Sequence, residues 1–429
     1  MEKLSKRLWS SFLLLGLMGQ FAWTIENMYF NVFLYNTITT DPSYIAAMVA
    51  ASAIAATLAT LFMGSLSDRV GKRKIFISGG YILWGLSTMA FGLISIKNAA
   101  AWFPALNAVS TAAMMVVVLD CVMTIFGSTA NDAAFNAYVT DTTNEKIRGK
   151  VESVLAVLPL VSMLIIFGGF DAMTKQGLWS RFFGIFGAAV TLTGIASIFL
   201  IKDSAVKAKN EPFLKNLVAG FRPAAVRENP PLYLTLAAFC LFSIAVQIFF
   251  PYLIIYMQHY LMIDNYAIVL GVVLILASLI SVIGGRFIDR VGKLNFVLPA
   301  AAVMFLGLVL MFFVRGAMFV IAAGTVMMGG YMLVTAALSA SIRDYTPKDS
   351  VGEFQGIRMI FAVMLPMIIG PSIGAAVIKN SGSTYTDLGV VKSVPTPAIF
   401  LAAAAALLLI VIPIFILKRR ARHENNLGR

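Results

Sequence analysis

The chain has 429 residues, of which 59% are hydrophobic and 12% are charged, and its mean hydropathy is +0.87. A soluble domain carries about 25% charged residues, so this composition excludes a water-soluble protein and makes lipid the solvent. The net charge of +13 does not indicate nucleic-acid binding, because the basic residues lie at the ends of apolar segments. Both cysteines fall within apolar runs, so we expect no disulfide framework.

Twelve apolar runs are each long enough to cross a bilayer, which takes roughly 20 residues. They fall near 9–37, 43–66, 75–96, 109–138, 151–170, 179–201, 232–257, 266–288, 293–314, 317–340, 354–379 and 396–417. Each run must satisfy its own backbone hydrogen bonds within the hydrocarbon, so we expect every one to be a helix. The segment 98–108 fits an outer loop or the beginning of a long fourth helix equally well.

The distribution of basic residues indicates the orientation of these spans. Twelve spans place both termini on one side of the membrane. If that side is the cytoplasm, all but six of the 33 Lys and Arg residues lie inside. This bias is typical of cytoplasmic loops. We therefore predict a multi-pass plasma-membrane protein with both termini in the cytoplasm.

A short string occurs twice and indicates an internal duplication. The segment 64–72, GSLSDRVGK, returns 221 residues later as GRFIDRVGK at 285–293, each time between two apolar runs. A basic turn repeated once per half-chain is typical of a duplicated membrane carrier. We predict an all-α membrane protein with twelve transmembrane helices in two pseudo-symmetric six-helix bundles. The bundles are 1–201 and 231–429, the second with a short basic tail.

The cytoplasmic linker 202–230 joins the two predicted bundles. Phe213, Leu217 and Phe221 recur in it at four-residue steps, which fits either an amphipathic helix on the membrane surface or a plain linker.

The repeated turn resembles the signature of the major facilitator superfamily, which lies between spans two and three with a weaker copy between spans eight and nine. The resemblance covers the whole layout and implies alternating access by rocking of two bundles. Within that superfamily, Asp120, the pair Asn131–Asp132 and the run from Asp141 to Arg148 resemble the glycoside–pentoside–hexuronide cation symporters. Members of the melibiose type carry two carboxylates in span two where this chain has Ala56 and Thr60, so the resemblance does not extend to that sodium site.

The charged residues of the repeated turns are candidates for a cytoplasmic gate whose ion pairs change between two states. A solvated turn that only sets topology is the alternative, because surface ion pairs are often worth under about 1 kcal/mol. The gate candidates are Gly64, Asp68, Arg69, Arg73, Asp141, Arg148, Asp289, Arg290, Asp344 and Glu353.

Span one is unusually polar for a membrane helix. Gln20, Thr24, Asn27 and Asn31 follow at steps of four, three and four, so they form one stripe with Trp23 at its edge. Such a stripe should face protein or a wet cavity. Glu26 lies near mid-depth, where an ionised carboxylate is costly unless it is paired. We therefore expect Glu26 to accept protons or bind substrate, with a structural hydrogen bond as the alternative.

Span four repeats this arrangement, and the second half of the chain does not. Asp120 is a candidate for both substrate binding and proton coupling. Asp132 is a candidate for proton coupling or for an ion pair with Arg358 or a signature arginine. The second half offers Gln247 and Tyr331 with methionines around them. The predicted substrate-binding residues are Trp23, Asn27, Asp120, Asn131, Gln247 and Tyr331, and the predicted proton-coupling residues are Glu26, Asp120 and Asp132.

The sequence contains no metal-ligand cluster, no phosphate loop and only two histidines, so we expect neither an enzyme nor a cofactor. We expect a monomeric secondary-active transporter that takes up a sugar or glycoside with protons. The alternative is an exporter or flippase of drug-like or lipid-like amphiphiles, which a methionine-rich second bundle would suit. A channel is disfavoured, because a duplicated two-bundle layout suits rocking rather than a standing pore.

Overall fold

The computed structural model describes residues 5–143, 147, 151–152, 154–202, 222–346, 356–387 and 390–427. The chain divides into two compact units, Met1–Phe213 and Leu214–Arg429. The division falls within the segment 202–230, of which residues 203–221 lie outside the described part together with the predicted amphipathic pattern. Eleven helices of the described part are long and apolar enough to cross a membrane.

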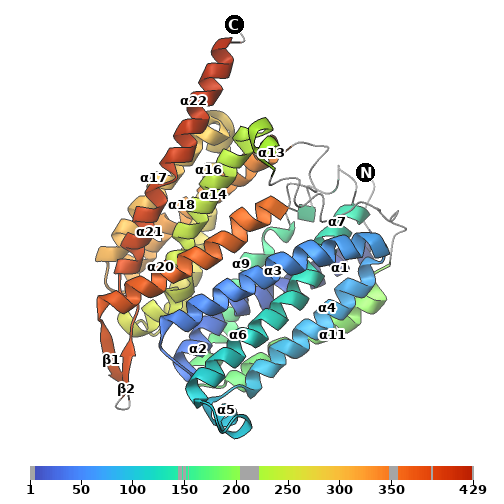
Figure 1. Ribbon diagram of the computed structural model, residues 1–429, viewed down its shortest axis with the longest axis vertical. Helices are drawn as coiled ribbons and strands as arrows, with labels where there is room; N and C mark the ends of the chain where they lie inside the picture. Colours follow the sequence, from blue (N-terminus) through green and yellow to red (C-terminus); the bar gives the residue numbers. More distant parts are fainter. Residues whose placement is uncertain are drawn as a thin grey trace. The chain divides into compact units, whose positions relative to one another are not determined.

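The first unit consists of helices in the order of the predicted spans (Figure 1). Its elements are α1 (Lys6–Thr24), η1 (Ile25–Tyr29), α2 (Phe30–Thr37), α3 (Pro42–Val70), α4 (Arg73–Ala90), η2 (Phe91–Leu93), α5 (Ile96–Trp102), α6 (Ala108–Gly127), η3 (Ser128–Phe135), α7 (Asn136–Thr142), α9 (Leu158–Gly169), α10 (Asp171–Lys175) and α11 (Trp179–Leu200). The fifth span is the short apolar helix α9 within the predicted range 151–170. For the segment 98–108 the sequence allowed either an outer loop or the beginning of span four. The structure shows a separate short helix, α5, followed by a turn.

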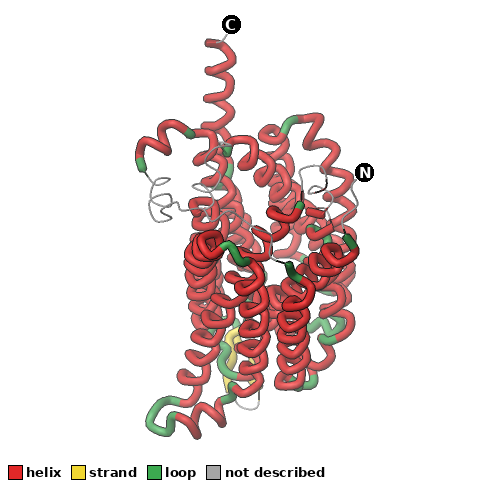
Figure 2. Tube along the Cα trace, turned by 90° about the vertical axis from the view of Figure 1, so that its right-hand side faces the viewer, coloured by secondary structure: helices red, strands yellow, loops and turns green. Residues whose placement is uncertain are grey.

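The second unit contains the remaining spans and one β-hairpin, drawn in yellow in Figure 2. Its elements are α13 (Pro223–Glu228), α14 (Pro230–Phe249), η4 (Phe250–Tyr252), α15 (Leu253–Ile255), η5 (Tyr256–Tyr260), α16 (Tyr266–Val291), α17 (Lys293–Phe313), α18 (Ala317–Tyr345), η7 (Ile360–Met364), α20 (Leu365–Ser381), β1 (Thr384–Asp387), β2 (Val390–Ser393), α21 (Ala398–Leu408) and α22 (Val411–Leu427). The strands are antiparallel, with Thr384 opposite Ser393.

Equivalent helices pack together in both units. In the first unit α3 packs on α6, α4 on α11, and α1 on both α9 and α11. In the second unit α16 packs on α18, α17 on α21, and α14 on both α20 and α21. In span numbers, these pairs are two with four, three with six, and one with five and six, in each half. The repeated packing is the structural counterpart of the repeated sequence string.

The repeated turn ends its helix at a glycine with positive φ in each half. Gly71 follows α3 with φ +67° in the left-handed helical region, and Gly292 follows α16 with φ +88° and an extended ψ of 137°. Glycine adopts both conformations at little cost. Basic residues precede each glycine in the last turn, Arg69 and Arg290, where they favourably meet the carbonyl end of the helix. The sequence GSLSDRVGK therefore stops span two and turns the chain into span three.

Candidate functional site

Glu26 lies in η1 and is buried inside the first unit, with 7% of its surface exposed. The hydroxyl of Thr124, in span four, donates a hydrogen bond of 2.9 Å to Glu26 Oε1. The second carboxyl oxygen, Oε2, is buried without a hydrogen-bond partner. Spans one and four therefore meet at a carboxyl group with only one of its two oxygens hydrogen-bonded.

Asp120 lies one turn before Thr124 in α6 and is 1% exposed. Ser52 of α3 is within hydrogen-bonding reach of its carboxyl group, and its Oδ1 atom has no partner. Glu26 and Asp120 are close enough for their charges to interact. In the part of the chain that the structure describes, no salt bridge forms to either group. The structure thus brings two predicted site residues together within one unit.

Asp132, the third predicted acid, is half-buried in η3. It accepts a hydrogen bond of 3.0 Å from Ser128 Oγ, one turn earlier in the same span. The signature arginine Arg73 binds Asp141 and Asp68 instead. Asp132 is also close enough to Glu26 for an electrostatic interaction. A local hydroxyl therefore holds this carboxyl group.

The Asn131 side chain joins three spans through neighbouring aromatic residues. Its Oδ1 accepts from Trp23 Nε1 at 3.4 Å, and its Nδ2 donates to the Tyr81 hydroxyl at 2.7 Å. Tyr81 in turn donates to the Leu15 carbonyl at 2.6 Å. The Trp23 ring lies 4.9 Å from that of Trp84. Because both ends of the Asn131 amide bind protein groups, the amide fixes the position of Trp23 and Tyr81.

The polar stripe of span one bonds largely to its own helix. Asn27 Nδ2 donates to the Trp23 carbonyl at 2.8 Å, and Asn31 Nδ2 donates to the Asn27 carbonyl at 2.9 Å. Thr24 Oγ1 binds the Gln20 carbonyl at 2.7 Å and lies 3.0 Å from Ser162 Oγ of α9. Such bonds to the carbonyl one turn earlier make polar side chains tolerable in an apolar environment.

The predicted substrate-binding residues of the second unit are half-buried and have apolar neighbours. Tyr331 of α18 stacks on Phe242 of α14, with ring centroids 5.7 Å apart. Gln247 lies on α14 beside Gly370 of α20. These two residues are placed within their own unit, and the first-unit candidates within theirs.

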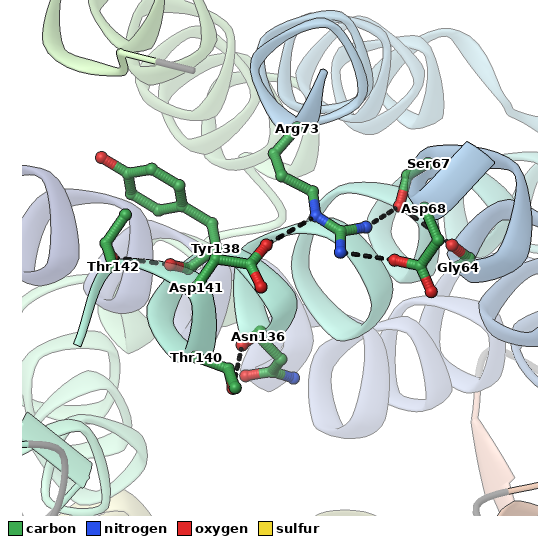
Figure 3. Close-up of polar contacts among 9 residues, drawn as sticks. All are labelled: Gly64, Ser67, Asp68, Arg73, Asn136, Tyr138, Thr140, Asp141 and Thr142. Carbon is green, nitrogen blue, oxygen red and sulfur yellow. Dashed lines mark hydrogen bonds and ion pairs between the residues drawn. The ribbon is translucent and has the colours of Figure 1, made fainter. Parts of the chain in front are cut away.

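Arg73 is the centre of the predicted gate in the first unit (Figure 3). Its side chain is 7% exposed and forms an ion pair with Asp68 and another, at 3.1 Å, with Asp141. Its third partner is Ser67 Oγ, at 2.5 Å. Gly64 lies one turn before Asp68, and the nearest neighbour that a Cβ there would meet is Ala133, at 3.7 Å. The guanidinium, at the start of span three, thus links the last turns of span two to the end of span four.

The second unit has a simpler version of this link. Lys293 Nζ lies 2.5 Å from Asp344 Oδ2, and the two side chains are 35% and 55% exposed. The pair lies in a groove of about 440 Å³ whose lining also includes Asn295, Ser341 and Tyr345. Arg290 is exposed, as is Arg69 of the first unit. The remaining gate candidates Arg148 and Glu353, and the side chain of Asp289, lie outside the described residues.

Sequence reasoning overlooked several partners of the predicted residues. Ser67 and Lys293 both lie within the repeated string, so their positions were visible although their roles were not. Ser52 and Tyr81 are far in sequence from Asp120 and Asn131, and no spacing within one helix points to them.

Two compact helical units with matching helix pairs and buried membrane acids define a duplicated membrane carrier. The family model described as Major Facilitator Superfamily matches residues 12–371 and 264–429. The chain belongs to this superfamily, and it is a multi-pass membrane transporter of small molecules, not an enzyme.

Solved structures share this fold. The nucleoside transporter NupG is 12% identical with a TM-score of 0.71, covering 96% of this chain and 99% of that one. The xylose transporter XylE from E. coli, in a partially occluded inward-open conformation, is 12% identical with a TM-score of 0.68, covering 96% and 98%. No curated protein matches the sequence.

Proposed function

We propose that the chain imports a sugar or glycoside together with protons, by alternating access. The observation that carries the proposal is the buried acid pair Glu26 and Asp120. Each has a carboxyl oxygen without a hydrogen-bond partner, and neither forms a salt bridge within the described residues. An ionised carboxylate is costly in such a place, so gaining and losing a proton is the change that these groups can make most readily.

The proposed substrate ligands are polar and aromatic side chains, the groups that orient a hydroxyl-rich molecule in a binding site. In the first unit these are Asp120, Asn27 and the Trp23 ring, which Asn131 holds in place. In the second unit they are Gln247 and Tyr331. NupG and XylE are named as carriers of a nucleoside and of xylose, both hydroxyl-rich solutes, and this agrees with the proposed class. Asp132 is the proposed third proton-coupling group.

Coupling requires that proton and substrate each favour the same conformational state through a difference in affinity. The proposed cytoplasmic gate distinguishes the two states, and Arg73 and Lys293 are among its described cations. We place the protein in the plasma membrane as a monomer with cytoplasmic termini and functional halves 1–201 and 231–429. We also propose membership of the glycoside–pentoside–hexuronide cation symporter group, on the residues around Asp120 and Asp141.

The packing of the methionines gives the exporter alternative little support. Met304 and Met327 are 0% and 2% exposed. A Cβ on Gly330 or Gly307 would touch the backbone of Met304 or Met327 respectively, so these methionines fill the contact between α17 and α18. A methionine in this position serves packing rather than a ligand surface.

Uptake by proteoliposomes tests the proposed function. A panel of labelled sugars and glycosides is first screened by thermal shift at two pH values, and the stabilising compound is then used for transport. We expect an inwardly directed proton gradient to drive its accumulation, and Glu26→Gln and Asp120→Asn each to reduce that accumulation at least tenfold. Glu228→Gln, which alters an exposed acid, is the matched control. Uptake that ignores the pH gradient and survives Asp120→Asn would falsify the proposal.

A further inference from the structure

Span one is interrupted by the π-helical segment η1, which contains Glu26. A π segment holds one residue more than the α-helical turn it replaces. Because one residue of an α-helix corresponds to about 100° of rotation, the helix beyond η1 is turned by about 100° relative to an uninterrupted span. The direction in which Glu26 points therefore depends on whether this extra residue is kept.

Both ends of η1 are tied to other helices by hydrogen bonds. Glu26 accepts from Thr124 at 2.9 Å, and the hydroxyl of Tyr29 donates to Asp171 Oδ1 at 3.1 Å. Asp171, at the start of α10, is 3% exposed and also lies 3.3 Å from Lys175 Nζ. The first bond orients the acid, and the second fixes the last residue of the π segment.

Aromatic side chains enclose the Tyr29 ring. The side chain is fully buried, and its ring centroid lies 5.1 Å from that of Phe182 and 6.1 Å from that of Phe167. These ring contacts are apolar and weakly directional, so the hydroxyl bond to Asp171 is the directional contact that fixes the position of Tyr29 along the span.

We infer that Tyr29 and Asp171 are positioning residues for Glu26. Their hydrogen bond keeps the extra residue in span one and so keeps Glu26 directed at Thr124, with Asp120 and Asp132 as the charged groups near it. Without the bond, η1 relaxes toward α-helical register and Glu26 turns away from Thr124. The consequence for transport rests on the proposed proton-coupling role of Glu26, whereas the orientation itself does not.

Infrared difference spectroscopy of the full chain in bilayers tests the orientation. The band of the Glu26 carboxyl group is assigned by its loss in Glu26→Gln, and Thr124→Val gives its position without the Thr124 hydrogen bond. We expect Tyr29→Phe to move the band to the Thr124→Val position. Tyr44→Phe, which removes a half-buried hydroxyl from α3, should leave it unchanged. A band that stays in place in Tyr29→Phe overturns the inference.

Variants of Asp171 separate the hydrogen bond from the charge. Asp171→Asn keeps an acceptor for Tyr29, Asp171→Ala removes it, and Lys175→Met removes only the cation. We expect the number of protons moved per substrate to fall at least twofold in Tyr29→Phe and Asp171→Ala and to stay at the wild-type value in the other two. Equal loss in Asp171→Asn and Asp171→Ala would show that charge, not the hydrogen bond, matters, and would overturn the inference.

The two experiments distinguish an error in the positioning role from an error in the proposed function. If wild-type transport moves no protons while the Glu26 band still shifts in Tyr29→Phe, the positioning role stands and the proposed function is wrong. If transport is coupled but neither the band nor the ratio changes in Tyr29→Phe, the positioning role is wrong.

Discussion

The hydroxyl of Thr124 is the residue-scale feature on which Glu26 depends, because it donates a hydrogen bond to one carboxyl oxygen while the other has no partner among the described residues. Thr124→Val keeps the shape of the side chain and leaves both carboxyl oxygens without a partner. A buried polar group that loses its partner costs about 1–3 kcal/mol. We expect a lower thermal unfolding midpoint in detergent for Thr124→Val, and a midpoint near that of the wild type for Thr124→Ser. Equal midpoints for the valine and serine variants would contradict this role of the hydroxyl.

The acids were visible in the sequence because a carboxyl group at mid-span stands out against apolar neighbours. Glu26 and Asp120 were predicted on this ground, and the structure places them close together. Their partners were less visible. Ser52 and Tyr29 are of residue types that are common in membrane helices, and their contacts to Asp120 and Asp171 join segments far apart in the chain. Only the packing of the helices determines such pairs.

At the scale of elements, Gly19 allows span one to approach spans three and four closely. A Cβ at this position would lie 2.3 Å from Asn131 Nδ2 and 2.8 Å from the Tyr81 hydroxyl. Gly19→Ala must therefore displace the Asn131–Tyr81 hydrogen bond, at a cost of about 1–3 kcal/mol. We expect its thermal unfolding midpoint to fall. Gly79→Ala, in a helix where nothing lies within 4 Å of the added atom, should keep or raise the midpoint. A fall of the same size in both variants would refute the close-approach argument.

The spans themselves were predicted well, and their interruptions were not. The observed helices α3, α4, α14 and α17 begin within about two residues of the predicted ranges, because the length of an apolar run is set by the thickness of the bilayer. The π segments η1, η3, η5 and η7 carry no such signal, since hydropathy does not change where one residue is inserted into a helix. The short helix α5 settles the segment 98–108 as separate from span four.

At the scale of the whole molecule, the two halves keep the same helix pairs and differ in their chemistry. The buried acids Glu26 and Asp120 belong to the first unit, whereas the second unit places Tyr331 on Phe242 and packs methionines between α17 and α18. The difference extends to the ion pairs of the repeated turns. Arg73 is buried with three partners, whereas the second unit has Leu294 at that position of the repeat and instead pairs Lys293, the counterpart of Lys72, with Asp344 in an exposed contact. Duplication therefore preserved the scaffold, and the sequence divergence between the halves changed the sites on it.

This asymmetry predicts unequal effects of equivalent substitutions. Asp141→Asn removes one of the two acids that neutralise a buried guanidinium, and loss of a partner from a buried pair is strongly destabilising, by about 3–5 kcal/mol in full burial. Asp141 is 23% exposed, so we expect the lower part of that range or less. Asp344→Asn affects an exposed pair, which is worth about 0–1 kcal/mol. The thermal unfolding midpoint should fall clearly in Asp141→Asn and barely in Asp344→Asn.

Salt screens exposed charges more than buried ones. Raising the ionic strength should therefore abolish the difference in midpoint between Asp344→Asn and the wild type, and leave the difference for Asp141→Asn. Equal losses that respond equally to salt would mean that the two ion pairs are energetically equivalent despite their different burial.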